Sequence, residues 1–163
     1  MDARELLIDS FNRIHERYGG VADGLSTEVL NHRPNGNGNP IGWLLWHLAR
    51  VQDDHLAGIT GETQVWAQWR DRFALPLGEW DIGYGHSTEQ VDAVQIGDAA
   101  LLTGYQEAVH RQTLRYLDGI DAAELDRVVD RRWDPPVTAG VRLVSVLGDC
   151  LQHLGQAAYL KGL

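Results

Sequence analysis

The sequence predicts an all-α fold, a four-helix bundle with additional short helices and long connecting loops, formed as a single domain over residues 1–163. Four long stretches carry apolar residues at intervals of three and four, which places those residues on one face of a helix. A chain of this length can bury roughly two-thirds of the surface that its unfolded form exposes. Neither an internal repeat nor a linker divides the sequence. These observations favour one bundle with its extra elements packed at one end.

The first part of the chain contains two of the long helices. The first is expected from about Asp2 to Ala22, and a short piece follows from Ser26 to His32. The segment from Pro34 to Pro40 is dense in asparagine, glycine and proline, and it is predicted to be a loop. The second long helix is expected from about Pro40 to Ala57, because Asn39 and Pro40 supply its start and Gly58 and Gly61 supply its stop.

The middle of the chain is less regular. A shorter helix is expected from Thr63 to Phe73, and residues Leu75–Ser87 read as irregular backbone. The pattern Ser87-x-x-Gln90 is a capping box and predicts the start of another short helix. A loop of this length in a bundle is more often functional than decorative.

The last part of the chain contains the other two long helices. The third is expected from Asp98 to Leu117, followed by a turn from Asp121 to Leu125. The segment Arg127–Thr138 contains a Pro-Pro pair and is expected to be extended or β-like. The fourth long helix is expected from Gly140 to Leu160.

The composition disfavours several kinds of partner. The formal net charge of −9 disfavours binding to nucleic acid or to an anionic membrane surface, since both need clustered Lys and Arg. No run of about 18 apolar residues and no basic leader with an apolar segment occur, so we expect a cytoplasmic location. The single cysteine, Cys150, has leucine neighbours and is expected to be a small buried filler. Sequence motifs of phosphate-binding loops, dinucleotide-binding folds and serine hydrolases do not occur.

Three side chains are candidates for a metal site. At about 100° per residue, His47 lies at the margin of the apolar stripe of the second long helix, and Asp149 and His153 lie at the equivalent margin of the fourth. Asp149 and His153 are four residues apart and therefore lie on one helix face, where both can reach a single ion. Two imidazoles and one carboxylate would leave an open coordination position. The alternative is that both histidines are hydrogen-bonded core residues and that Asp149 is a solvated charge.

His55 is not expected to join this triad. It lies about 12 Å along the helix from His47 at 1.5 Å per residue, which is too far for both to bind one ion. We expect His55 to be a hydrogen-bonded core histidine or a group that orients a metal ligand.

Aromatic residues are expected to form a substrate pocket beside the metal. Trp43 and Trp46 face away from the apolar stripe and must pack on other elements, for which the Trp80 and Trp133 loops are candidates. Glycines on both sides of Tyr84 allow the backbone to approach another element closely, and His86 follows them as a pocket residue or a proton-transfer group. A loop that merely covers the end of the bundle is the alternative. The predicted pocket residues are Trp43, Trp46, Tyr84, His86, Trp133 and Gln156.

The chain resembles the DinB-like superfamily over nearly its whole length. The residues that carry the resemblance are Trp43-Leu-Leu-Trp-His47-Leu-Ala and Asp149-x3-His153-x-Gly155-Gln156. More narrowly, the chain looks like the actinobacterial members that are grouped with the N-terminal, metal-binding domain of mycothiol-dependent maleylpyruvate isomerase. The superfamily pattern implies His47 as the first metal ligand and His153 as the last, whereas Asp149 stands where a middle histidine would be.

The resemblance also implies a function. Characterised relatives are four-helix bundles that bind a divalent metal, often zinc or nickel, and transfer or isomerise small thiols such as mycothiol, bacillithiol or glutathione. The expected function is therefore metal-dependent thiol S-transfer or isomerisation, with a small-molecule thiol and an electrophile as partners. Relatives also suggest a homodimer. The alternative is a noncatalytic bundle that binds a metal or another small ligand.

Overall fold

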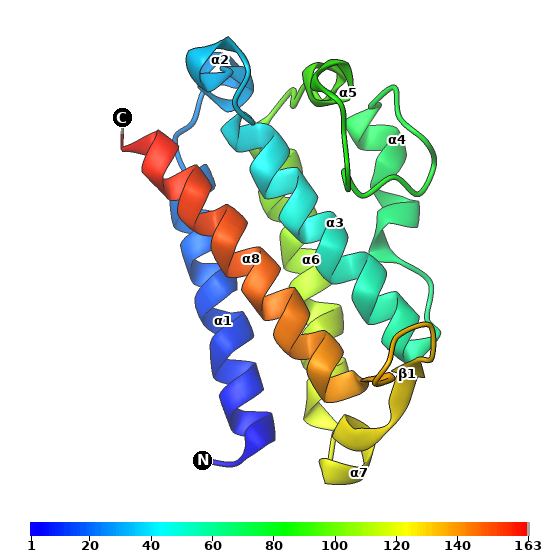
Figure 1. Ribbon diagram of the computed structural model, residues 1–163. Helices are drawn as coiled ribbons and strands as arrows, with labels where there is room; N and C mark the ends of the chain where they lie inside the picture. The colour runs from blue at the N-terminus through cyan, green and yellow to red at the C-terminus, as the bar shows by residue number, and fades with distance from the viewer. Residues whose placement is uncertain (163) are drawn as a thin grey trace.

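Four long helices form the body of the protein in the computed structural model, which describes residues 1–162 (Figure 1). They are α1 (Ala3–Ala22), α3 (Ile41–Thr60), α6 (Ala99–Asp118) and α8 (Ala139–Lys161). α3 lies along α8, and α1 packs on both α6 and α8. The predicted all-α bundle is therefore confirmed, and Leu163 of the predicted domain lies outside the described residues.

Polar caps define where three of these helices begin. The Asp2 carboxylate accepts the backbone N–H of Glu5, and the Glu5 side chain accepts the N–H of Asp2 in return. Asp98 caps α6 and Thr138 caps α8 through one side-chain oxygen each, without a bond in return. These caps satisfy N–H groups that have no partner within the helix.

The end of α3 differs from the prediction. Of the two predicted stop residues, Gly58 does not end the helix, which continues past Ala57 for another turn to Thr60, whereas Gly61 does end it, in the left-handed conformation at φ 76°. Ile59 in this added turn is 4% exposed. Burial of its side chain outweighs the cost of about 1 kcal/mol for a glycine inside a helix.

Eight short elements connect the long helices. They are α2 (Thr27–Asn31), η1 (Pro34–Gly36), η2 (Val65–Gln68), α4 (Arg70–Phe73), α5 (Thr88–Ala93), α7 (Ala122–Asp126), β1 (Val128–Asp130) and β2 (Val137–Thr138). The two strands pair as an antiparallel hairpin, which agrees with the predicted extended segment. The capping box at Ser87 and Gln90 is present in both directions.

Two short segments depart from the sequence predictions. The predicted loop after Pro34 contains one 3-10 turn. The helix predicted from Thr63 to Phe73 is divided into η2 and α4, which meet at Trp69. Tertiary contacts decide this geometry, because the Asp53 carboxylate accepts two backbone N–H groups at the start of η2 and the Trp69 ring lies over Gly104 of α6.

α3 is the central element of the core. Its first 13 residues, from Ile41 to Asp53, are all buried. Cys150 of α8 is completely buried against it and donates its thiol hydrogen to the Leu48 carbonyl, so the expected role as a filler is confirmed. Burial raises the pKa of this thiol far above its usual range, and Cys150 is therefore an inert thiol. Within the described residues, no helix has the length and apolar character needed to cross a membrane.

Candidate metal centre

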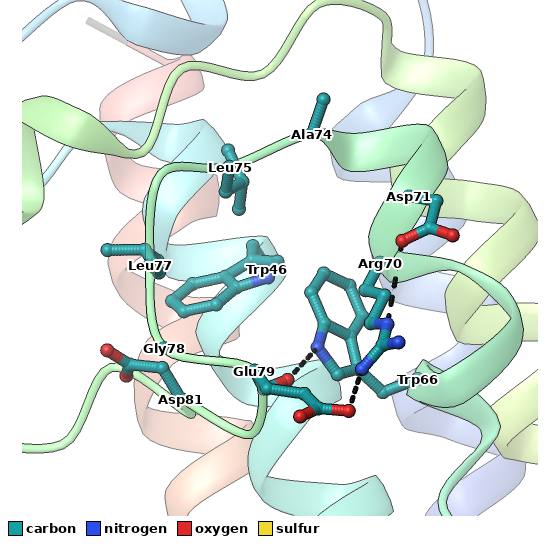
Figure 2. A pocket seen from close by; sticks show the side chains of 10 residues that line it. All are labelled: Trp46, Trp66, Arg70, Asp71, Ala74, Leu75, Leu77, Gly78, Glu79 and Asp81. Carbon is teal, nitrogen blue, oxygen red and sulfur yellow. Dashed lines mark hydrogen bonds and ion pairs between the residues drawn. The ribbon is translucent and has the colours of Figure 1, made fainter.

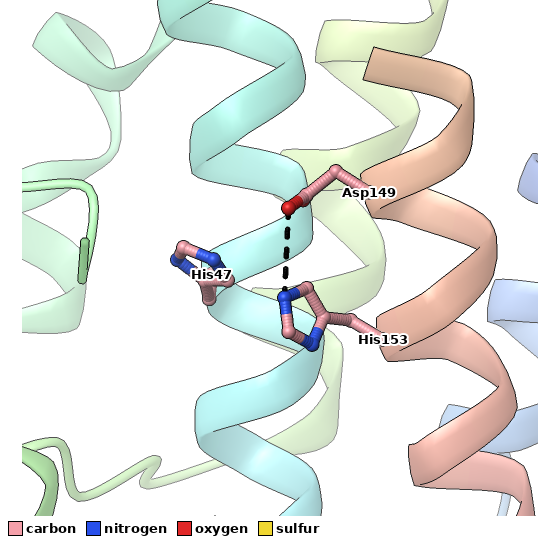
Figure 3. Close-up of side chains that lie close together, drawn as sticks. All are labelled: His47, Asp149 and His153. Carbon is pink, nitrogen blue, oxygen red and sulfur yellow. Dashed lines mark ion pairs between the residues drawn. The ribbon is translucent and has the colours of Figure 1, made fainter. Parts of the chain in front are cut away.

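His47, Asp149 and His153 meet between α3 and α8 (Figure 3). One nitrogen from each histidine and one carboxylate oxygen all lie within 4.8 Å of one another. Two ligand atoms that are each about 2.1 Å from one ion lie at most about 4.2 Å apart. Small side-chain rotations would therefore bring the three atoms into the geometry of a shared ion.

His47 is held in one orientation by the backbone of the irregular segment. Its Nδ1–H donates to the carbonyl oxygen of Ile82 at 2.5 Å, which leaves Nε2 as the nitrogen available to an ion. His47 is 4% exposed. Burial lowers the pKa of this imidazole and so favours the neutral form, which is the form that binds a metal.

His153 is oriented by a second carbonyl-type acceptor. Its Nδ1–H donates to the side-chain amide oxygen of Gln156 at 2.8 Å, and its Nε2 lies 3.6 Å from Asp149 Oδ1. The contact with the Asp149 carboxylate raises the pKa of His153. The predicted pocket residue Gln156 is thus a hydrogen-bond partner of a candidate ligand.

The Asp149 carboxylate is incompletely satisfied. Its Oδ2 atom is buried and has no hydrogen-bond partner among the described residues. A buried carboxylate oxygen without a partner is costly, and a bound cation would remove that cost. Together with two imidazoles whose Nδ1 atoms are already occupied, this donor set fits a divalent ion.

Trp43 forms one wall of the centre. Its indole stacks on His47 with ring centroids 4.6 Å apart, and it lies nearly perpendicular to the His153 ring with ring centroids 6.2 Å apart. The indole N–H donates to Nδ1 of His86 at 3.2 Å, and Nε2–H of His86 donates to Asp81 at 3.0 Å. Both nitrogens of His86 are therefore occupied, so this ring fixes the irregular segment to α3 rather than offering a free proton-transfer group.

The predicted close approach of the glycine-flanked segment occurs at Gly83. A Cβ built there would lie 2.9 Å from Nδ1 of His47 and 2.9 Å from the Trp46 ring. Trp46 also stacks on His86, with 6.0 Å between the ring centroids. Trp43 and Trp46 therefore pack against this segment. The contacts are made by Gly83 and His86 of the segment. Tyr84, next to Gly83, is 89% exposed.

Two predicted residues stand apart from the centre. Trp133 lies in the hairpin between β1 and β2, beside the C-terminal end of α3, and it is 64% exposed (Figure 1). His55 is half-buried, lies 3.6 Å from the Asp54 carboxylate and lines a cavity beside that hairpin. The hairpin lies at the C-terminal end of α3, whereas Trp43 and Trp46 belong to its N-terminal half, so Trp133 does not join the predicted pocket.

A buried ionic network near the centre was not foreseen from the sequence. Arg50 and Asp53 are both completely buried in α3, and their side chains approach to 3.4 Å. Arg50 also donates to the backbone carbonyls of Trp80 and Asp81, the two residues that precede Ile82. This network therefore holds in place the segment whose Ile82 carbonyl orients His47. The sequence signal for this network is an arginine and an aspartate three residues apart within a mostly apolar helix.

A cavity of about 510 Å³ lies on the other side of this segment (Figure 2). Its walls include the rings of Trp46 and Trp66, and the Trp66 indole donates to the Glu79 carbonyl at 3.1 Å. An ion pair between Arg70 and Glu79 lies at one side of the cavity. None of the three candidate ligands is among its described lining residues, and so it is not the metal site.

Comparisons with known proteins agree with the helical fold. The sequence model of the DinB superfamily matches residues 10–157 of the chain. A solved structure described as the conserved protein of locus from Enterococcus faecalis has 32% sequence identity and a TM-score of 0.90, covering 99% of this chain and 96% of that chain. No relative with a curated description matches the chain significantly.

Proposed function

This chain belongs to the DinB superfamily, and we propose that it binds one divalent metal ion through His47, Asp149 and His153 and uses that centre for transfer of a small thiol. The observation that supports this proposal is that the Nδ1 atoms of both histidines already make hydrogen bonds. Each histidine donates its Nδ1–H to a carbonyl oxygen, which directs both Nε2 atoms to the space that Asp149 also faces. Metal-binding histidines are held in this way in most known sites.

The donor set favours zinc or nickel as the ion. Imidazole suits both metals, and a carboxylate in place of a third imidazole is acceptable to either. Three protein ligands leave at least one coordination position for an external molecule, as in catalytic sites. The exposed fractions of the Asp149 and His153 side chains, 32% and 15%, leave the centre accessible from solvent.

The reaction class that we propose is S-transfer or isomerisation with a mycothiol-type thiol and an electrophile. A divalent ion at this centre would lower the pKa of a thiol and so supply a thiolate nucleophile. The chain itself supplies the orientation of the ligands and an apolar wall, because Trp43 is 5% exposed and covers one face of His47. Tyr84 is exposed and follows Gly83, which lies against His47, so it is our candidate for contact with the substrate.

A noncatalytic metal- or ligand-binding bundle is the second candidate function. The observation that favours it is the state of His86, the side chain expected to transfer protons. Its two ring nitrogens are held by Trp43 and Asp81, so it has no free nitrogen for a substrate. A thiolate bound to an ion needs no such group for its attack, whereas protonation of a leaving group does.

Metal analysis and a thiol assay separate these functions. We expect metal-replete protein to hold one divalent ion per chain, and Asp149→Ala to hold none, while replacement of the exposed His32 by alanine changes nothing. The loaded protein should then accelerate conjugation of mycothiol or glutathione with monochlorobimane, and a chelator should abolish that rate. A stoichiometric ion without any acceleration would select the noncatalytic function. Failure of the wild type to hold an ion would refute both metal-dependent proposals.

A further inference from the structure

A separate cavity of about 490 Å³ lies beside the β1–β2 hairpin, and we call it the hairpin pocket. Three arginines line it: Arg131 and Arg132 from the hairpin and Arg142 from the beginning of α8. The C-terminal half of α3 forms the opposite side and contributes Asp54 and His55. Arginines thus gather at one hollow in a chain whose net charge is −9.

The acidic groups of the hairpin pocket already have partners. Asp130 is 8% exposed and accepts hydrogen bonds from Arg132 at 2.8 Å and from Arg142 at 3.0 Å. Asp54 accepts from a side-chain amide at 2.9 Å. A guanidinium carries five N–H donors, so the single bond from Arg142 to Asp130 leaves most of its donors unused. Arg131 is exposed and makes no hydrogen bond to the described residues.

The hairpin pocket and the metal centre lie along the same seam between α3 and α8. Arg142 precedes Asp149 by seven residues, and Asp54 follows His47 by seven. Seven residues are almost two full turns, so each pair shares a helix face, about 10 Å apart along the axis. Burial, and then the Arg142 charge, lower the pKa of His55, which is therefore a neutral hydrogen-bonding group at pH 7.

We propose that the hairpin pocket is an oxyanion subsite, in which Arg131 and Arg142 bind a carboxylate or phosphate group of a small molecule. The planar guanidinium presents paired donors whose spacing matches these two anions. If the same molecule also reaches the metal centre, which rests on the function proposed above, its oxyanion lies about 10 Å from its metal-binding atom. The hairpin pocket then selects elongated anionic substrates.

The subsite is tested on the full chain after removal of metal by a chelator and dialysis. Three probes are titrated: succinate, inorganic phosphate and the uncharged succinamide, with the imidazole signals of His55 followed by NMR. We expect saturable shifts with at least one anion and none with succinamide. The anion that binds more tightly identifies the oxyanion as carboxylate or phosphate.

Matched variants locate the binding. Arg142→Gln and Arg131→Gln should each weaken anion binding about tenfold, which is the loss of one charge-assisted hydrogen-bonding group. Arg131 is exposed and its side chain has no hydrogen-bond or ion-pair partner among residues 1–162, so its variant keeps the fold even if Arg142→Gln does not. Arg115→Gln, on α6 and outside the hairpin pocket, should bind as the wild type does.

The proposal is overturned if neither anion gives a saturable shift, or if Arg115→Gln weakens binding as much as Arg131→Gln. Because the measurement needs no metal, its result is independent of whether the chain binds an ion. Loss of metal binding with intact anion binding would refute only the proposed function.

Discussion

Replacement of Gly83 by alanine tests how closely the irregular segment and the metal centre depend on each other. Gly83 has φ +86°, a conformation that side-chain-bearing residues rarely adopt. Its added Cβ would lie 2.9 Å from both His47 Nδ1 and the Trp46 ring, and 3.2 Å from the Trp43 ring. These rings are held by the core, so the segment itself must move.

Two effects lower the stability of the Gly83→Ala variant, and their free energies add. The left-handed conformation costs about 1–2 kcal/mol for alanine, and overpacking against buried rings costs about 1–3 kcal/mol. We therefore expect the free energy of unfolding to fall by about 2–5 kcal/mol. The movement also carries the Ile82 carbonyl away from His47, and loss of such an orienting group lowers metal affinity about 10- to 100-fold.

Gly85→Ala is the matched control. Gly85 has φ +71°, but a Cβ there would meet nothing within 4 Å, so only the conformational cost of about 1–2 kcal/mol applies. Urea unfolding of the metal-free variants measures stability, and competition with a chromophoric chelator measures zinc affinity. If Gly83→Ala and Gly85→Ala bind zinc equally well, the segment does not orient His47.

Three other perturbations follow from the structure. Gln156→Ala removes the acceptor that orients His153 and should lower zinc affinity about tenfold. Gln152→Ala, on the same helix and exposed, should leave zinc affinity unchanged. Chelator competition measures both variants, and equal zinc affinities would show that the hydrogen bond has no role. Asp53→Ala leaves a buried guanidinium without its charge partner and should lower the free energy of unfolding by about 3–5 kcal/mol in urea, and a loss below about 1 kcal/mol would contradict this. Burial lowers the pKa of His110 to about 4. As the pH falls, the unfolded chain therefore binds a proton at His110 before the folded chain does. The free energy of unfolding should decline by up to about 3 kcal/mol between about pH 6.5 and pH 4. Thermal unfolding should show a smaller decline over this range in His110→Gln, and identical slopes would exclude His110 as the cause.

The bundle could be predicted because its signals are local. Helix starts at Asp2 and Asp98 follow from side chains that cap the backbone within three residues, and the amphipathic spacing gives the buried faces. Which of two glycines, Gly58 or Gly61, ends α3 could not be read in the same way, because burial of Ile59 depends on elements distant in sequence. Gly58 is a stop signal only where no such packing competes with it.

The candidate ligands could be placed together because helix geometry is regular. The projections that set His47 against Asp149 and His153 use only the 100° turn per residue and the antiparallel packing of a bundle. The groups that orient these ligands were harder to predict. The Ile82 carbonyl belongs to irregular backbone, whose path is fixed by Arg50, and a backbone carbonyl leaves no mark in the sequence.

The aromatic pocket was predicted only in part for the same reason. Trp43 and Trp46 do pack on the irregular segment, as their position on the outer side of α3 requires. Trp133 does not, since the hairpin that carries it pairs with itself and lies at the other end of α3. Loop residues cannot be assigned to a site from helix periodicity alone.

The most direct test of the metal centre is an anomalous-scattering map of crystals grown with zinc or nickel. We predict a single strong peak between α3 and α8, at about 2.0–2.2 Å from Nε2 of His47, Nε2 of His153 and a carboxylate oxygen of Asp149. The peak should be absent from crystals of Asp149→Ala prepared in the same way. A peak at another place, or none between these three side chains at metal-replete concentrations, would contradict the assignment of this centre.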